Sequence, residues 1–182
     1  GKTTLIAHWL QHTARLSAWL ALDEHDHDLH SFLTYFVAAL QTLFSDAGQE
    51  TLALLGASQT PPLRVLTTTL INELNDLEQP FILVVDDYPL VHDLAVHEVF
   101  NELLQHPPAA LHLVLITRID PPLNLVKLAA RNQALILRAQ DLRFLPAEAM
   151  AFMQQGTGRL LDDAEVAQLV ERAEGWAAGL RL

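Results

Sequence analysis

Apolar residues follow two patterns that alternate along the chain. Short continuous apolar runs, typical of strands buried on both faces, occupy residues 17–22, 81–87, 111–118 and 134–138. Between these runs lie longer stretches in which apolar residues recur every three or four positions, the period of a helix with one buried face. Strands that alternate with helices in this way predict a parallel α/β sheet with right-handed crossover connections.

The helical stretches are marked by their apolar faces and by prolines. The first helix is expected within residues 1–10, while Pro80 and Pro107 end later helices and Pro121 opens another. Residues 48–62 form a loosely defined stretch with no clear period, and no element is predicted there. Three groups of apolar residues at helical spacing are predicted to face the core: Phe32, Phe36, Ala39, Leu40 and Leu43; Leu66, Leu70, Leu74 and Leu77; and Val96, Val99, Phe100, Leu103 and Leu104.

The alternation of strands and helices stops near Gln140. Residues 146–155, 162–174 and 175–182 are predicted to be helices with no strand between them. We therefore predict an α/β domain over residues 1–140 and the start of an all-helical domain over residues 141–182.

Gly1, Lys2, Thr3 and Thr4 match the second half of the phosphate-binding motif G-x-x-x-x-G-K-[ST]. In this motif the backbone N–H groups of the loop, and the positive end of the helix that follows it, surround the phosphates of a nucleotide. Lys2 would contact the β- and γ-phosphates, and Thr3 would offer its hydroxyl to Mg²⁺. Four residues alone are a weak signal, because a solvated turn can have the same sequence.

Two acidic residues, Asp86 and Asp87, follow an apolar run in the Walker B pattern. Ligands of open α/β sheets bind at the carboxyl ends of the strands, where these side chains would lie. Asp86 is expected to hold Mg²⁺, usually through water, and Asp87 to polarise an attacking water molecule. The alternative is a solvated loop, or the cap of the following helix.

Thr117 and Arg118 end the next apolar run in the same manner. An arginine at a strand end beside phosphates can bind the γ-phosphate and respond to its loss. The alternative is a surface salt bridge. Together the three motifs predict a P-loop nucleotide-binding domain over residues 1–140, with ATP or ADP and Mg²⁺ as its ligands.

Composition removes several other classes of function. The chain has 11 basic and 22 acidic residues, a net charge of −11, and no basic stripe, so we do not expect this segment to bind nucleic acid directly. No apolar run approaches the ~20 residues that cross a bilayer, and no signal peptide is recognisable. The absence of cysteine excludes disulfides and thiol catalysis and fits a cytoplasmic protein.

Several stretches together resemble the MalT-like regulators of the LuxR family, which belong to the STAND class of P-loop ATPases. The stretches are residues 84–88, 96–98, 111–114, 117–118, 120–123, 139–144 and 174–180. This combination spans nearly the whole chain and is far more specific than either phosphate-site motif. The resemblance places Lys2 and Thr3 at the end of Walker A, Asp86 and Asp87 in Walker B, and Arg118 after the fourth strand of the family's sheet. It also favours a structural role for His97.

The resemblance implies a molecular switch. Bound ADP would hold the intact protein closed, and an inducer that binds elsewhere would allow nucleotide exchange and self-assembly. A sensor region and a C-terminal helix-turn-helix that binds DNA would follow the ATPase, whose hydrolysis would be slow. Gly175 and Trp176 stand where related ATPases carry a Gly-x-Pro element, but the proline is missing, and we expect Trp176 to pack rather than to bind nucleotide.

A second interpretation is a non-catalytic fragment or interaction module that no longer binds nucleotide. A P-loop sheet has a central strand immediately before the phosphate loop, and we expect the sheet formed by this chain to lack that first strand. The loop N–H groups carry much of the affinity for phosphate. The sequence therefore predicts that the isolated chain binds ATP weakly or not at all and is inactive as an ATPase.

Overall fold

The computed structural model describes residues 1–22, 28–88, 93–157 and 163–173. The chain forms two compact units, one from Lys2 to Asn124 and the other from Leu125 to Leu182 together with Gly1. Each unit is described by itself. No helix among the described residues is long and apolar enough to cross a membrane.

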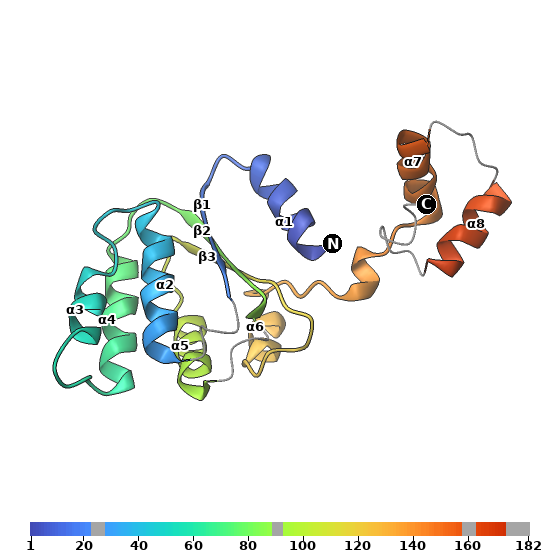
Figure 1. Ribbon diagram of the computed structural model, residues 1–182. Helices are drawn as coiled ribbons and strands as arrows, with labels where there is room; N and C mark the ends of the chain where they lie inside the picture. Colours follow the sequence, from blue (N-terminus) through green and yellow to red (C-terminus); the bar gives the residue numbers. More distant parts are fainter. Residues whose placement is uncertain (23–27, 89–92, 158–162, 174–182) are drawn as a thin grey trace. The chain divides into compact units, whose positions relative to one another are not determined.

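The first unit is built on a parallel sheet of three strands in the order β1-β2-β3 (Figure 1). The strands are β1 (Leu16–Ala21), β2 (Phe81–Asp86) and β3 (Leu111–Leu115). Each residue of the central strand β2 is buried, as expected for a strand with neighbours on both sides and helices on both faces. The predicted parallel α/β fold is confirmed, although β3 is only partly buried and ends before residue 116.

Alternate residues of β2 serve two separate cores. Phe81, Leu83 and Val85 face the larger core, which three long helices cover. The Phe32 ring of α2 lies 5.5 Å from the Phe100 ring of α5, so these two helices also pack on each other. The helices are α2 (Leu29–Gln41), α4 (Leu63–Asn75) and α5 (Leu94–Gln105). Most of the predicted apolar positions are buried, but Leu43 and Leu77 lie just beyond the ends of α2 and α4, and Leu104 is not part of the core.

The opposite face of the sheet is covered by α1 (Lys2–Gln11). Ile6 and Leu10 of this helix pack on Ile82, Val84 and Ile116. A short turn joins the end of α1 to the beginning of β1, so α1 runs antiparallel to the strands. Its first residues consequently lie toward the carboxyl edge of the sheet (Figure 1).

A short helix, α3 (Gln49–Leu55), lies in the loosely defined stretch over residues 48–62, where the sequence predicted no element. Its first turn is held by Glu73 of α4, whose carboxylate accepts hydrogen bonds from the N–H groups of Glu50 and Thr51 at 2.8 and 3.1 Å. The hydroxyl of Thr51 donates to the same carboxylate at 2.6 Å. The residues that stabilise α3 are distant in sequence, which explains why the local pattern did not reveal the helix.

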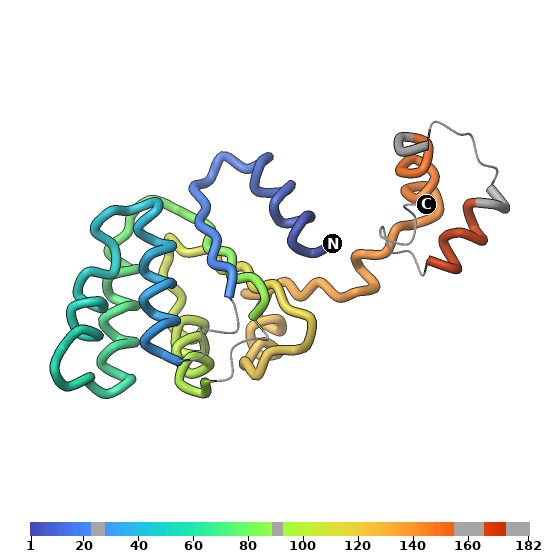
Figure 2. The backbone as a smooth tube through the Cα atoms, viewed as in Figure 1, coloured from blue at the N-terminus to red at the C-terminus, as the bar shows by residue number. Residues whose placement is uncertain are grey.

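The described part of the second unit contains the helices α6 (Leu125–Ala130), α7 (Pro146–Thr157) and α8 (Asp163–Arg172) and the 3₁₀ turn η2 (Ala139–Leu142) (Figure 2). Ala149, Met153 and Val166 form the small core between α7 and α8. The predicted helix over residues 175–182 lies outside the described residues.

The prediction of a strand at residues 134–138 is wrong. This segment has no regular structure, and no described strand pairs with it. Leu135 and Leu137 are 85% and 52% exposed, so their apolar character does not reflect burial in a sheet. An apolar run of this length becomes a strand only where a neighbour satisfies its backbone groups.

Candidate functional site

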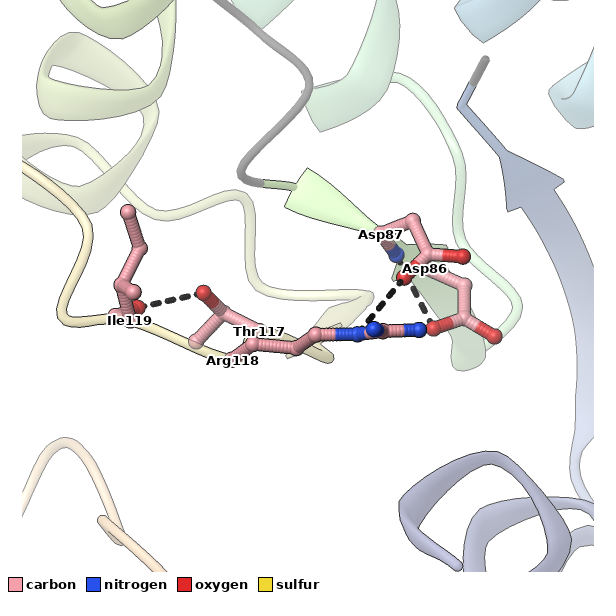
Figure 3. A network of polar contacts seen from close by, with 5 residues as sticks. All are labelled: Asp86, Asp87, Thr117, Arg118 and Ile119. Carbon is pink, nitrogen blue, oxygen red and sulfur yellow. Dashed lines mark hydrogen bonds and ion pairs between the residues drawn. The ribbon is translucent and has the colours of Figure 1, made fainter.

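The carboxyl ends of β2 and β3 bring the predicted acidic pair and the predicted arginine to one edge of the sheet (Figure 3). The two strands are held in register beyond their formal ends. The N–H of Ile116 donates to the carbonyl of Val85 at 2.8 Å, and the N–H of Tyr88 donates to the carbonyl of Ile116 at 3.2 Å. Side chains that follow the two strands therefore meet at the same level.

Asp86 is the last residue of β2 and is only 6% exposed. One of its carboxylate oxygens, Oδ1, accepts a hydrogen bond from the N–H of Asp87 at 2.9 Å. This bond fixes the carboxylate at the edge of the sheet. Asp86 therefore presents hard oxygen donors at the position where ligands of parallel sheets bind.

Asp87 adopts a left-handed backbone conformation, with φ at 54°. Non-glycine residues rarely adopt this conformation, although aspartate tolerates it better than most. The strand ends here as a result, and the side chain of Asp87 leaves the regular alternation of β2. It is half exposed and lies beside Arg118, whose Nε is 3.9 Å from Oδ1 of Asp87 (Figure 3).

Arg118 keeps 78% of its side chain exposed despite this pairing. An ion pair between exposed groups at this distance contributes little stability, because water and salt screen it. The hydroxyl of Thr117 donates to the carbonyl of Ile119 and closes the turn that carries the arginine. The guanidinium is therefore held at the edge of the sheet and remains accessible to an anion.

Lys2, Thr3 and Thr4 form the first turn of α1. The side chain of Lys2 is partly buried, whereas Thr3 and Thr4 are exposed. The first turn of α1 lies toward the carboxyl edge of the sheet, on the face that α1 covers (Figure 1). Gly1 precedes α1 and is grouped with the second unit.

No group of three or more His, Asp or Glu side chains among the described residues is arranged to hold a metal ion. A metal cage made only of protein side chains is therefore not formed by this part of the chain. Mg²⁺ is usually bound by one or two protein oxygens together with phosphates and water. The carboxylate of Asp86 and the hydroxyl of Thr3 are oxygen donors of this kind, so the residues present fit Mg²⁺.

Two contacts behind this edge were missed by sequence reasoning. The hydroxyl of Tyr88 and Nδ1 of His97 lie 2.7 Å apart in the buried interior, which agrees with a structural role for His97. Asn101 and Asn124 are also hydrogen-bonded. The position of Tyr88 directly after the acidic pair was a signal for the first contact; nothing in the sequence indicated the second.

The parallel sheet with Asp86 and Asp87 at the end of its central strand, and with α1 beginning at Lys2, is a P-loop-like α/β fold. A scan against protein-family models finds no match. The similarity to individual curated proteins is nevertheless extensive. The chain is 36% identical over all 182 residues to the HTH-type transcriptional regulator MalT of Yersinia enterocolitica.

The MalT proteins of Serratia proteamaculans and Yersinia pestis are 36% and 35% identical over the same 182 residues. The chain therefore resembles these MalT proteins along its whole length. It spans about a fifth of the length of these relatives, since the match covers 20% of each.

Proposed function

We propose that this chain is the nucleotide-binding switch domain of a transcription regulator of the STAND class in the LuxR family. The observation that carries the proposal is the meeting of Asp86, Asp87 and Arg118 at the carboxyl edge of the sheet, toward which the first turn of α1 also points. Acidic groups, one cation and a helix N-terminus at one edge suit an anionic ligand that carries a divalent cation.

The phosphates would bind at the beginning of α1. Lys2 supplies a positive charge there, and the positive end of the α1 helix dipole adds to it. Thr3 is exposed and would offer its hydroxyl to Mg²⁺, with the carboxylate of Asp86 as a second oxygen donor. When bound, Mg²⁺ would neutralise the phosphate oxygens and orient them.

Asp87 and Arg118 would then respond to the third phosphate. Asp87 would polarise a water molecule, and Arg118 would exchange its weak contact with Asp87 for an oxygen of the γ-phosphate. Since that contact is exposed and weak, little stability is lost when the arginine changes partner. ADP and ATP would therefore favour different positions of Arg118.

The output of this switch would be regulation of transcription. The relatives are named HTH-type transcriptional regulators, and the net charge of −11 argues that DNA is bound by another part of the protein. Slow hydrolysis and signal-dependent self-assembly in the intact protein complete the proposal, together with a cytoplasmic location. In the competing proposal the chain is an interaction module that does not bind nucleotide.

Titration of the protein at its natural full length with ADP and with Mg-ATP tests the proposal. Lys2→Ala should weaken the binding of both nucleotides at least tenfold, because a charged contact to phosphate is worth roughly 1.5–3 kcal/mol. Lys127→Ala, which changes a lysine of α6, is the matched control and should leave both affinities unchanged. Absence of nucleotide binding by the wild-type protein would favour the interaction module, and equal measurable affinities of wild type and Lys2→Ala would show that nucleotide binds at another site.

A further inference from the structure

Helix α5 contacts both segments that form the acidic and cationic edge. His97 and Asn101 lie one helical turn apart on this helix, and each bonds to a residue beyond the end of a strand. His97 holds the segment that follows β2, and Asn101 holds the segment that follows β3. Through these bonds, His97 and Asn101 hold the two segments whose side chains form the Asp87–Arg118 contact.

The first attachment fixes the backbone next to Asp87. Tyr88 is 1% exposed, its ring packs edge-on against Phe100 of α5 at 5.1 Å, and its hydroxyl lies 2.7 Å from Nδ1 of His97. Burial raises the pKa of this hydroxyl well above its ordinary value, so the hydroxyl stays neutral. The N–H of Tyr88 also bonds to β3 through Ile116. Asp87 therefore lies between two fixed neighbours, Asp86 and Tyr88.

The second attachment closes the loop that carries Arg118. Oδ1 of Asn101 accepts hydrogen bonds from the backbone N–H and from Nδ2 of Asn124, at 3.1 and 3.3 Å. The beginning of the same loop is held by the Thr117 hydroxyl, and its middle by a bond from the N–H of Leu123 to the carbonyl of Pro121 at 2.7 Å. Asn124 is the last residue of the first unit, so Asn101 anchors the chain where it leaves that unit.

We propose that His97 and Asn101 are positioning residues, which set the distance between the side chains of Asp87 and Arg118. Through these two residues, binding of a ligand at the edge of the sheet is coupled to helix α5. Neither residue contacts the ligand. A shift of Arg118 toward a γ-phosphate would pull on a loop whose far end is attached to Asn101. This inference rests on the proposed function for its ligand, whereas the attachment itself can be tested without nucleotide.

Substitutions at Asn101 distinguish a role in positioning the loop that carries Arg118 from a general effect on the stability of the fold. Asn101 acts only as an acceptor in its two bonds to Asn124, so Asn101→Asp keeps the acceptor and Asn101→Leu removes it. Asn72→Leu, at an exposed position of α4, is the matched control. Tyr88→Phe removes the hydroxyl at the other attachment, with Tyr35→Phe on exposed α2 surface as its control.

Hydrogen exchange of the nucleotide-free, full-length protein gives the first measurement. We expect the backbone amides of residues 117–124 to exchange about fivefold faster in Asn101→Leu, the factor that one ordinary hydrogen bond represents, and at the wild-type rate in Asn101→Asp. Equal exchange in wild type and Asn101→Leu would overturn the proposal.

Paired titrations with ADP and Mg-ATP give the second measurement. Asn101→Leu and Tyr88→Phe should change the ratio of the ATP and ADP dissociation constants at least threefold, while both control variants keep the wild-type ratio. An unchanged ratio in a protein that binds nucleotide would overturn the positioning role. If the wild-type protein binds neither nucleotide, the proposed function is wrong, and the exchange measurement alone decides whether α5 positions the edge.

Discussion

Nε of Arg118 lies 3.9 Å from Oδ1 of Asp87, although the two residues follow different strands and are separated by helix α5 in the sequence. The contact exists because β2 and β3 are parallel neighbours in register, so their carboxyl ends share one edge. It combines a carboxylate in a strained backbone conformation with an exposed guanidinium.

Arg118→Ala should reduce the preference between ATP and ADP and leave the affinity for ADP nearly unchanged. The reason is that the arginine is proposed to contact only the third phosphate. The free energy of unfolding should also change little, since the side chain is 78% exposed. Parallel titrations of Arg118→Ala and of Arg64→Ala, at an exposed position of α4, would measure this. A large loss of ADP affinity confined to Arg118→Ala would contradict the assigned role.

Asp86 and Asp87 should differ in their effects when each is changed to Asn. Asp86→Asn should lower the Mg²⁺ dependence of ATP binding, because a neutral amide is a poorer ligand for this ion. Asp87→Asn should retain nucleotide and slow hydrolysis by roughly 10²-fold or more, the usual contribution of a positioned general base. Mg²⁺ titrations and single-turnover hydrolysis of the two variants would distinguish the roles. Identical behaviour of both variants would show that the roles are not divided.

The left-handed conformation of Asp87 predicts an asymmetric response to two small substitutions. Asp87→Gly should be at least as stable as wild type, because glycine adopts φ at 54° without a steric penalty. Asp87→Ala should be less stable than Asp87→Gly by about 1 kcal/mol, the cost of a left-handed conformation for a residue with a Cβ. Urea unfolding measures both values. Equal stabilities would mean that the residue relaxes to an ordinary backbone conformation.

Glu73→Ala should destabilise the first unit by roughly 1–2 kcal/mol, because the carboxylate accepts three hydrogen bonds at the beginning of α3. Thr51, which donates two of them, is fully buried and would lose its partner. Glu78→Ala, at an exposed position after α4, should be close to neutral. Similar losses from the two substitutions, measured by urea unfolding, would show that the cap is not important.

The carboxylate of Asp28, at the beginning of α2, predicts that the stability of the folded protein depends on pH. Hydrogen bonds from the backbone N–H and then the hydroxyl of Ser31 lower the pKa of this carboxyl below its ordinary value of 3.8. A depressed pKa in the folded state contributes stability that is present above the ordinary value and is lost as the pH falls through the folded value. The stability difference between wild type and Asp28→Asn should therefore shrink below pH ~4. A difference that stays constant from pH 6 to pH 3 would contradict this.

Prediction from the sequence succeeded where the local apolar pattern reflects how the segment is buried in the fold. The run that became β2 is apolar throughout, and only a central strand with both faces covered buries such a run. That placement also predicted that Asp86 and Arg118 would share an edge, because parallel neighbours end together. The register of the two strands then determined the contact that the structure shows between Asp87 and Arg118.

The failures have non-local causes. Helix α3 depends on Glu73, which lies 22 residues after Thr51, and no local period reveals such a cap. Residues 134–138 have the apolar character of a strand but no described neighbour to pair with. The Asn101–Asn124 bond depends on how α5 packs beside the loop after β3, which only the folded chain defines.

The most direct measurement is the identity and amount of nucleotide that acid denaturation releases from the purified full-length protein. The account predicts close to one adenine nucleotide per chain after incubation with ADP and removal of the unbound ligand, and almost none in Lys2→Ala. Wild-type protein that releases no nucleotide after this treatment, while remaining folded by circular dichroism, would contradict the central claim that the edge formed by Asp86, Asp87 and Arg118 belongs to a nucleotide site.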